Sequence, residues 1–520
     1  MIDILSVDNM RASDAATIAA GTPGRELMMR AARGVFDACF SEDALQKRGA
    51  SSGGQKVAIV CGSGNNAGDG YALALLLREA GIDCSVFCVY DRFSEDGRYY
   101  FDKCVEQGIK IVDGLEEAKK VSKRTVPFDT VVDCLLGTGF RGDVRAEIAE
   151  AIDAINASGA YVISVDINSG LNGDTGMAKT CVQSDLTVSI GSFKPGHFLN
   201  MAKDVMKDKT NVDIGITPAD TPYHLIEKSD VTAALGTREN FSNKGTYGYS
   251  ALIGGSTKYS GAIRLAYMAN AAMRSGAGVV KIALPASLVH DVIPHILEST
   301  IFPLSDTIGT ANASEVMSTN AEVVYDQNEI DELTSNVKTV AFGMGIGTGE
   351  GAEAILKHLL TKYTGTLVID ADGLTLLSKQ PREILANRKG ITVLTPHIKE
   401  FSRLTGLDID RILEDPIEIA RLYSQETGAI VLLKGPSTMI TDGDRVFITD
   451  RGCAGMATAG SGDVLSGILA AVTAYVEDKC LATAVGAYIN GAAGKLAEER
   501  FGSISMTAGD TVAAIPDAIK

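Results

Sequence analysis

Short apolar segments alternate with segments of helical periodicity along most of this chain, and this alternation constrains its fold most strongly. After residues 1–48, which are predicted to form helices around Met10 and Arg25, strands are predicted at 57–60, 84–89, 130–133 and 161–165, with helices at 71–80 and 146–157. Strands separated by helices of this length favour a parallel sheet with crossover helices.

The alternation begins again in the second half of the chain. Strands are predicted at 248–253, 279–284, 339–342, 367–369, 391–394, 430–433, 439–440 and 446–448, and helices at 261–275 and 352–362. Residues 217–222, which contain two prolines and follow a strand-like segment at 210–216, are the best candidate for a boundary. We therefore predict two α/β domains in tandem.

The composition narrows the classes of function. The chain has 520 residues, 45% of them hydrophobic, and a formal net charge of −17, which argues against nucleic acid and anionic membranes as partners. No window of 18 apolar residues is present, and the first ten residues lack the pattern of a signal peptide. Nine cysteines without paired spacing predict reduced thiols, a cytoplasmic location and no zinc site.

A glycine-rich turn in the second half predicts an anion site. Ala459-Gly-Ser-Gly462 is followed by Asp463 and then by an apolar run with helical spacing. Such a turn directs several N–H groups, and the positive end of the helix dipole, at one point, which suits a phosphate. Asp463 would lie at the mouth of the site and take a proton from a hydroxyl that attacks the phosphate. The alternative is a helix-capping aspartate without a ligand.

Polar residues follow three strands of the first half. One loop contains Gly62-x-Gly64-x-x-Ala67, a weak dinucleotide fingerprint, and it also carries Asn65, Asn66 and Asp69. Asp133 and Asp166 each end a predicted strand, and Ser169 follows shortly after the second. Because the ends of parallel strands converge, Asn66, Asp133, Asp166 and Ser169 are expected to surround one pocket suited to an alkali or alkaline-earth ion. The alternative is that each aspartate only caps a turn.

These loops resemble the NAD(P)H-hydrate epimerase family, which interconverts the R and S forms of hydrated NADH and NADPH and has a Rossmann-like sheet. The resemblance is carried by the Asn65 loop, by Asp133-Cys-Leu-Leu-Gly-Thr-Gly-Phe and by Val165-Asp-Ile-Asn-Ser-Gly-Leu. It implies residues 1–217 as this domain, K⁺ bound by Asn66, Asp133 and Ser169, and Asp166 as the acid/base group. The implied contacts with the hydrated dinucleotide are Asn65, Asn66, Ala67, Gly68, Asp69, Gly137, Thr138, Gly139, Phe140, Arg141, Gly142, Asp143 and Asp166.

The second half resembles the ADP/ATP-dependent NAD(P)H-hydrate dehydratases, which are ribokinase-like. The resemblance covers residues 226–520 and is carried by Gly254-Gly-Ser, Asp370-Ala-Asp-Gly-Leu, Leu394-Thr-Pro-His, Leu433-Lys-Gly and the turn before Asp463. It implies that the hydrated nicotinamide contacts Ala262, Gly345, His397 and Asp463. The implied nucleotide contacts are Lys434, Gly435, Pro436, Ser437, Thr438 and Gly462. From its own context, His397 is more simply explained as a loop histidine with satisfied hydrogen bonds.

Five positions depart from the family patterns. Ala67 and Ala459 stand where glycine is usual, and Ile398-Lys399 stands where Pro-Gly is usual. Asn168 stands where proline is usual, and we expect this change to loosen its loop.

The implied activity is repair of hydrated NADH and NADPH. The first domain interconverts the R and S forms, and the second dehydrates the S form with ADP (or ATP) and Mg²⁺, giving AMP and phosphate when ADP is the donor. We expect ADP as the donor and a homo-oligomer on the resemblance, and no membrane partner on the composition. The alternatives are a ribokinase-like kinase for a vitamin alcohol and a nucleotide-sensing module in which Asp463 is idle.

Overall fold

The computed structural model describes residues 1–51, 54–119, 128–269, 274–307 and 322–520. The chain divides into two compact units, Asp3–Tyr223 and His224–Lys520, the latter together with Met1–Ile2. Each unit has a central sheet with helices on both of its faces, which confirms the predicted fold class.

The sheet of the first unit has seven described strands, all parallel, in the order β4-β3-β2-β5-β6-β7-β8. Its strands are β2 (Lys56–Cys61), β3 (Asp83–Cys88), β4 (Lys110–Asp113), β5 (Thr130–Cys134), β6 (Tyr161–Val165), β7 (Ser184–Ile190) and β8 (Met206–Val212). The chain adds strands on one side of β2 and then continues from β5 on its other side. Ligands of such sheets bind at this reversal point, beyond the carboxyl ends of the strands.

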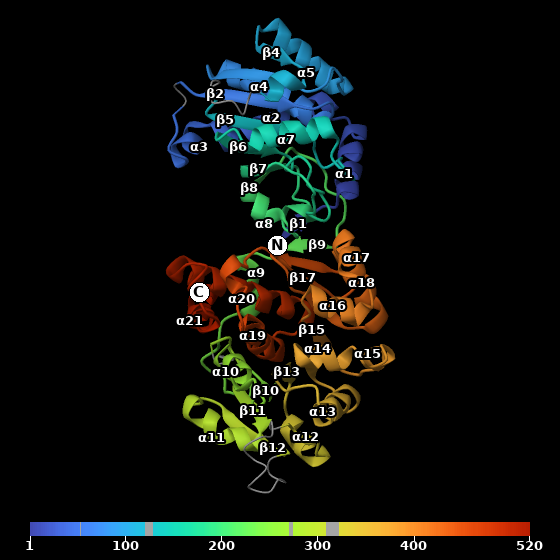
Figure 1. Ribbon diagram of the computed structural model, residues 1–520, viewed down its shortest axis with the longest axis vertical. Coiled ribbons are helices and arrows are strands. Elements are labelled where there is room, and N and C mark those ends of the chain that lie inside the picture. Colours follow the sequence, from blue (N-terminus) through green and yellow to red (C-terminus); the bar gives the residue numbers. More distant parts are fainter. Residues whose placement is uncertain (52–53, 120–127, 270–273, 308–321) are drawn as a thin grey trace. The chain divides into compact units, whose positions relative to one another are not determined.

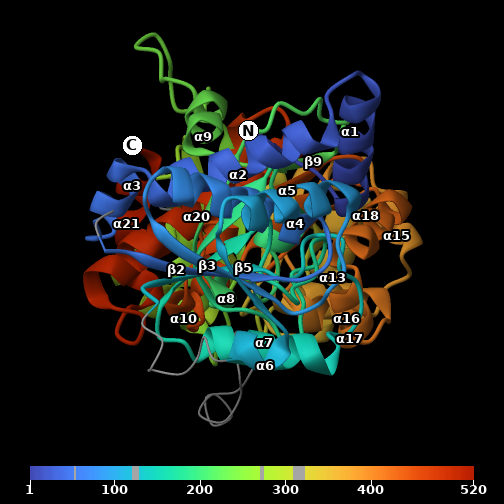
Figure 2. The same cartoon turned by 90° about the horizontal axis from the view of Figure 1, so that it is seen from above.

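Helices cover both faces of this sheet (Figure 2). Apolar residues of α2, α4 and α5 form a core on one face, and those of α6 and α7 form a core on the other. The helices are α1 (Val7–Ala19), α2 (Gly24–Phe40), α3 (Glu42–Lys47), α4 (Asn65–Glu79), α5 (Glu95–Glu106), α6 (Leu115–Ala118), α7 (Ala146–Asn156) and α8 (Ala202–Val205).

The second unit has a larger, mixed sheet of eleven described strands, in the order β1-β9-β18-β17-β16-β15-β14-β13-β10-β11-β12. Its strands are β1 (Ile2–Ile4), β9 (Tyr223–Leu225), β10 (Tyr249–Gly254), β11 (Val279–Pro285), β12 (Thr300–Leu304), β13 (Thr339–Met344), β14 (Thr366–Ile369), β15 (Thr392–Leu394), β16 (Ile430–Leu433), β17 (Thr438–Thr441) and β18 (Val446–Thr449). The strands from β12 to β16 are parallel, whereas β16, β17 and β18 pair antiparallel.

Figure 1 shows α9, α10, α19, α20 and α21 on one side of this sheet and α12 to α18 on the other. The helices are α9 (Lys228–Leu235), α10 (Ser260–Ala269), α11 (Val289–Val292), α12 (Gln327–Thr334), α13 (Glu350–Thr361), α14 (Asp372–Leu377), α15 (Glu383–Ala386), α16 (Ile398–Thr405), α17 (Ile409–Glu414), α18 (Pro416–Thr427), α19 (Ser461–Tyr475), α20 (Lys479–Phe501) and α21 (Ala508–Ile519). Helix α19 is buried from Val464 to Ala474, as expected of a helix that is apolar on all sides.

Several boundaries differ from the predictions. The strand-like segment 210–216 is only partly a strand, because β8 ends at Val212. Helix α4 begins at Asn65, so the predicted polar loop is the first turn of this helix. The predicted helix 261–275 is observed as α10, and residues 270–273 lie outside the described residues. None of the helices within the described ranges is long and apolar enough to cross a bilayer.

Candidate functional site

The first candidate site lies at the reversal point between β2 and β5, where Asn66, Asp133 and Ser169 come together. Ser169 Oγ donates to Asp133 Oδ1 at 2.5 Å and accepts from the Leu136 amide at 2.8 Å. Asn66 Nδ2 donates to the Leu136 carbonyl at 3.0 Å. Asp133 and Ser169 are fully buried, and the buried Asn66 Oδ1 has no partner among the described residues. The convergence of the three side chains that the resemblance names as ligands is therefore observed.

Asp166, the residue that follows β6 and Val165, is held in its charged form. Its Oδ1 accepts from Lys194 Nζ at 2.6 Å, and its Oδ2 accepts from the Thr138 amide at 3.0 Å and hydroxyl at 2.9 Å. Burial alone would raise the pKa of Asp166, but the Lys194 charge and these hydrogen bonds hold the pKa below its usual value.

His197 fixes the backbone on which Asp166 stands. Its Nδ1 accepts from the Lys194 amide at 3.0 Å, so Nε2–H donates to the Asp166 carbonyl at 2.7 Å. Burial and the Lys194 charge lower the pKa of His197 to about 4, which keeps the ring neutral. This bond supports Asp166 at a φ of 66°, in the left-handed region.

Sequence reasoning missed Lys194 and His197. The available signal was the run Phe193-Lys-Pro-Gly-His-Phe, which directly follows β7 with Gly191 and Ser192 and resembles the polar ends of the neighbouring strands.

The loop from Gly137 to Asp143 reaches the site at only one end. A Cβ at Gly137 would lie 3.2 Å from Asp166 Oδ2 and 3.3 Å from the Asn66 Cβ, so a side chain there would crowd the site. Farther along, Gly139, Arg141, Gly142 and Asp143 are exposed, and Phe140 is half-buried. In the first turn of α4, Ala67 and Gly68 are buried, whereas Asn65 is exposed.

Asn168 does not loosen its loop, contrary to the expectation from the missing proline. Its side chain is fully buried. Its Nδ2 donates to the Val182 carbonyl at 2.8 Å and to the Val205 carbonyl at 3.0 Å, and its Oδ1 accepts from Thr187 Oγ1 at 2.5 Å. The amide therefore ties together segments that proline, which has no side-chain donor, would leave unconnected.

The second candidate site lies at the start of α19. The N-cap is Gly460, at a φ of 93° and with no side-chain hydrogen bond, so Asp463 in the first turn is not the capping residue. Burial, and secondly the charge of Asp370, raise the pKa of Asp463 to about 7, although Lys434 opposes the change. This carboxyl therefore titrates near neutral pH, which suits a general base.

Asp370 and Lys434 form the polar centre of this site. Asp370 is 2% exposed, and its two oxygens accept from Lys434 Nζ at 3.0 Å and from Ser466 Oγ at 2.7 Å. Lys434 Nζ also lies 3.8 Å from Glu400 Oε2. A Cβ at Gly462 would stand 3.4 Å from Asp370 Oδ2 and 3.6 Å from Lys434 Nζ, which places the glycine turn against this pair.

Two of the expected nicotinamide contacts, Ala262 and Gly345, lie against one another, and His397 lies beside Lys434. A Cβ at Gly345 would lie 3.0 Å from that of Ala262. His397 forms a bridge with Lys434 in the sheet and is the N-cap of α16, where its Nδ1 accepts from the Glu400 amide at 3.1 Å. The simpler explanation of His397 as a satisfied histidine is therefore correct for one ring nitrogen, while the side chain remains 49% exposed.

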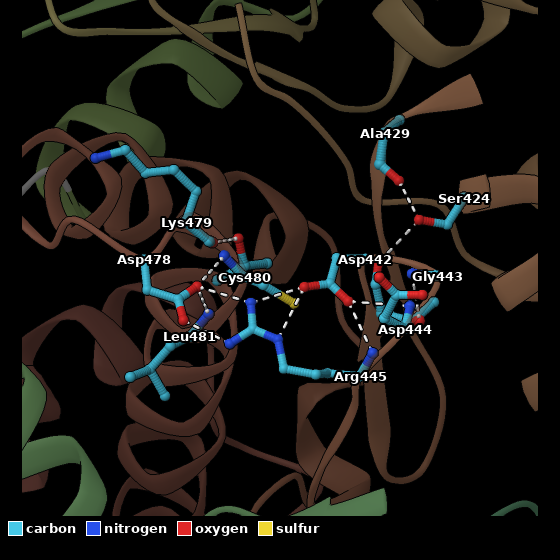
Figure 3. A network of polar contacts seen from close by, with 12 residues as sticks. Ser424, Ala429, Asp442, Gly443, Asp444, Arg445, Asp478, Lys479, Cys480 and Leu481 are labelled. Atoms are coloured by element: carbon cyan, nitrogen blue, oxygen red, sulfur yellow. Dashed lines mark hydrogen bonds and ion pairs between the residues drawn. The ribbon is translucent and has the colours of Figure 1, made fainter. Parts of the chain in front are cut away.

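The predicted nucleotide loop, Lys434 to Thr438, joins β16 to β17. Gly435 and Pro436 are exposed, whereas Ser437 is buried and donates to Asp450 Oδ1 at 2.9 Å. The other end of the β17–β18 hairpin is braced by Arg445, which bonds to Asp442 and to Asp478, the N-cap of α20 (Figure 3). The hairpin is thus held at both ends.

Comparisons with known proteins give a match for each half of the chain. Residues 250–517 match the NAD(P)H-hydrate dehydratase family, and residues 24–196 match the family described as YjeF-related protein N-terminus. The bifunctional NAD(P)H-hydrate repair enzyme of Moorella thermoacetica is 33% identical over 477 residues, 90% of this chain and 88% of that protein. The enzyme of the same name from Escherichia coli is 29% identical, over 93% of this chain and 87% of that protein.

Among solved structures, the ADP/ATP-dependent NAD(P)H-hydrate dehydratase of Bacillus subtilis, co-crystallized with ATP/Mg²⁺, aligns with 56% of this chain and 96% of its own length, at 25% identity and a TM-score of 0.47. Both halves match, and full-length relatives are aligned over nearly their whole length. This chain therefore belongs to the family of bifunctional NAD(P)H-hydrate repair enzymes.

Proposed function

We propose that residues 226–520 dehydrate the S form of hydrated NADH and NADPH at the expense of an adenine nucleotide, and that residues 1–217 interconvert the R and S forms. The single observation that carries the proposal is Asp463, a carboxyl whose pKa is raised to about 7 in the glycine-rich first turn of a buried helix. A base with this pKa and a phosphate site within one helical turn are the two parts that phosphorylation of a hydroxyl needs.

In the second domain, Asp463 takes the proton of the ring hydroxyl as that hydroxyl attacks the terminal phosphoryl group. Backbone N–H groups of the turn stabilise the charge on the phosphoryl oxygens, and Gly462 allows the group to approach closely. Phosphate is a better leaving group than water, so its elimination restores the dihydropyridine. Ala262, Gly345 and His397 are proposed to line the nicotinamide site, and Lys434 to Thr438 with Gly462 to line the nucleotide site.

In this scheme Lys434 interacts both with Asp370 and with the phosphates of the nucleotide. Its ammonium is already paired with Asp370, so its charge is fixed in place before the nucleotide arrives. A point charge held in this way stabilises phosphate oxygens without the entropic cost of ordering a free lysine.

Mg²⁺ is proposed to accompany the nucleotide. The described residues contain no cluster of three or more His, Cys, Asp or Glu side chains that could hold a metal. The ion would therefore be held mainly by phosphate oxygens and water, its usual arrangement with nucleotides. When bound, it neutralises charge on the phosphates.

K⁺ is proposed in the first domain, held by Asn66, Asp133 and Ser169. The fit rests on the unpartnered, buried Asn66 Oδ1 and on the exclusively oxygen donors beside it, which suit a hard cation. The ion would supply positive charge close to the bound dinucleotide. Asp166 is proposed as the catalytic carboxylate of this domain, with the first turn of α4 and the loop Gly137 to Asp143 as substrate contacts.

We propose ADP as the donor and a homo-oligomer by analogy with the family, and a cytoplasmic location because the nine cysteines lack paired spacing. A repair assay tests the central proposal: the S hydrate is incubated with Mg²⁺ and with ADP, ATP or no nucleotide, and the absorbance band of NADH is followed. Recovery of NADH only with a nucleotide supports dehydration. A stable phosphorylated product instead would support a kinase, and binding without turnover would support a sensing module.

A further inference from the structure

The first site needs a proton donor that its known parts do not supply. If this domain interconverts R and S hydrates, as proposed above, the hydroxyl on the ring carbon must leave one face and return on the other. Breaking that C–O bond requires a proton on the departing oxygen, because hydroxide is a poor leaving group. The donor must therefore be a protonated group close to Asp166.

Asp166 itself is unsuited to this task. Its carboxylate receives one hydrogen bond from Lys194 and two from Thr138, all of which favour its charged form. Lys194 is 1% exposed, and its ammonium is shared between Asp166 and the Ile190 carbonyl, at 2.9 Å from the latter. This pair can stabilise a positive charge on the ring, but it cannot readily deliver a proton.

Helix α1 forms a further part of the same site. Arg11 Nη2 donates to the Gly139 carbonyl at 3.2 Å, and Arg141 Nη2 bonds to Asp8 at 2.7 Å, so the helix lies along the proposed substrate loop. Met10 packs against Gly191, three residues before Lys194. Asp14 follows Met10 by four residues and Arg11 by three, so it lies on the same side of α1, one turn farther along.

The surroundings of the Asp14 carboxyl favour its protonated form. Its Oδ1 is buried with no hydrogen-bond partner among the described residues, which is costly for a charged oxygen. Burial raises the pKa of Asp14 to about 6; Lys194 opposes this and the Asp166 charge adds to it. Asp69 lies on the first turn of α4. Burial raises its pKa well above the usual range, and the charges of Asp166 and Asp14 add to this effect.

We propose that Asp14 is the proton donor and acceptor of the epimerase site, and that Asp166 provides fixed negative charge. Asp14 gives its proton to the ring hydroxyl, the C–O bond breaks, and its electron pair leaves with oxygen as water. The lone pair of the adjacent ring nitrogen forms a C=N bond, whose positive charge faces Asp166. Water then adds to the opposite face of the carbon, the C=N electrons return to nitrogen, and the proton released by that water returns to Asp14.

Two carboxyls with separated pKa values and separate roles are a recurrent arrangement in catalysis. Asp14 is only half-buried, so solvent can restore its proton between turnovers. Asp69 is the competing candidate for the donor, and the experiment must distinguish the two.

The test measures R/S interconversion by chromatographic separation of the two hydrates, using the full chain. Asp14→Asn should lower kcat of interconversion by about 10²-fold or more, with KM changed far less, because acid–base catalysis contributes roughly that much. Asp14→Glu should recover part of the rate. Asp153→Asn, an exposed carboxyl on α7, is the control and should match the wild type. Dehydration of the S hydrate should be unchanged in all three variants.

Thermal unfolding separates a catalytic from a structural role. A folded-state pKa above the unfolded value means that stability present below pH 3.8 is lost as the pH rises through about 6. Asp14→Asn should therefore raise Tm at pH 8, whereas loss of a structural contact would lower Tm.

The proposal is overturned if Asp14→Asn keeps interconversion within threefold of the wild type, if only KM changes, or if Asp69→Asn alone removes kcat. A wild-type chain that fails to interconvert R and S hydrates would instead overturn the proposed function of the domain.

Discussion

The two domains place their proposed catalytic carboxyls in opposite electrostatic surroundings. Asp166 is paired with a buried lysine, which holds its pKa low, whereas burial, and secondly the charge of Asp370, raise the pKa of Asp463 to about 7. The nearby lysine of the second domain, Lys434, is bonded to Asp370 and not to Asp463. Burial favours a high pKa in both carboxyls, and the two differ in that a lysine bonds directly to Asp166 but, in the second domain, to the neighbouring Asp370.

The largest effect is expected from Asp463→Asn. Removal of the base should lower nucleotide-dependent dehydration by about 10³-fold, within the usual range for acid–base groups, and leave R/S interconversion unchanged. NADH absorbance measures the first reaction and separation of the hydrates the second. Asp444→Asn, on the exposed turn of the hairpin, is the control. Equal damage to both reactions would contradict the assignment of one site to each domain.

The next effect tests the pairing in the first domain. Lys194→Met leaves the Asp166 carboxylate buried without its cation, which typically costs about 3–5 kcal/mol of stability. Lys207→Met breaks a pair with Asp185 in which the lysine is 79% exposed, so it should cost at most about 1 kcal/mol. Because the chain has no tryptophan, urea unfolding is best followed by circular dichroism. Equal losses in the two variants would show that Lys194 does not hold Asp166 charged.

A smaller effect is expected from Asp370→Asn. Dehydration by the wild type should fall as the pH drops below about 7, because Asp463 becomes protonated. Loss of the Asp370 charge removes a cause of the raised pKa and frees Lys434, and both changes lower the pKa of Asp463. The acid limb of the rate profile should therefore move to lower pH by about one unit. Ser466→Ala removes a hydrogen bond to Asp370 but no charge, so its limb should stay in place.

The smallest effect concerns the support of the proposed nucleotide loop. Arg445→Ala removes the bonds to Asp442 and Asp478 shown in Figure 3 and should cost about 1 kcal/mol, since the arginine is 41% exposed. KM for the nucleotide should change by less than threefold, because Arg445 lies at the end of the β17–β18 hairpin opposite the proposed nucleotide loop. Arg411→Ala, whose pair with Glu414 is exposed, is the control. A large rise in KM would show that the hairpin transmits its position to the nucleotide site.

Local pattern was sufficient to predict much of this molecule. The convergence of Asn66, Asp133 and Ser169 follows from the geometry of parallel sheets, in which strand ends meet at one edge. The strand β7 was missed because Ser184, Thr187 and Ser189 interrupt its apolar pattern, and these polar residues are buried. The hydrogen bonds of Asn168 with Ser184 and Thr187 offset part of the cost of burying them.

Pairings between distant residues were not predictable. Lys194 reaches Asp166 from the segment after β7, and Lys434 reaches Asp370 across 64 positions of the chain. Asp14 comes from a helix whose buried side carries the polar Ser13 and Thr17 beside Val7 and Met10, so its sequence does not mark which face packs inward. Each of these contacts depends on how elements pack in three dimensions, and a single sequence does not report that packing.

The left-handed backbone at Asp166 has a consequence for mutagenesis. Asparagine, like aspartate, tolerates a φ of 66°, whereas alanine pays a conformational penalty of about 1–2 kcal/mol there. In an alanine scan, a loss of activity at this position would therefore come partly from impaired folding and not only from removal of the carboxylate. Asparagine is the replacement that removes the charge and keeps this backbone conformation.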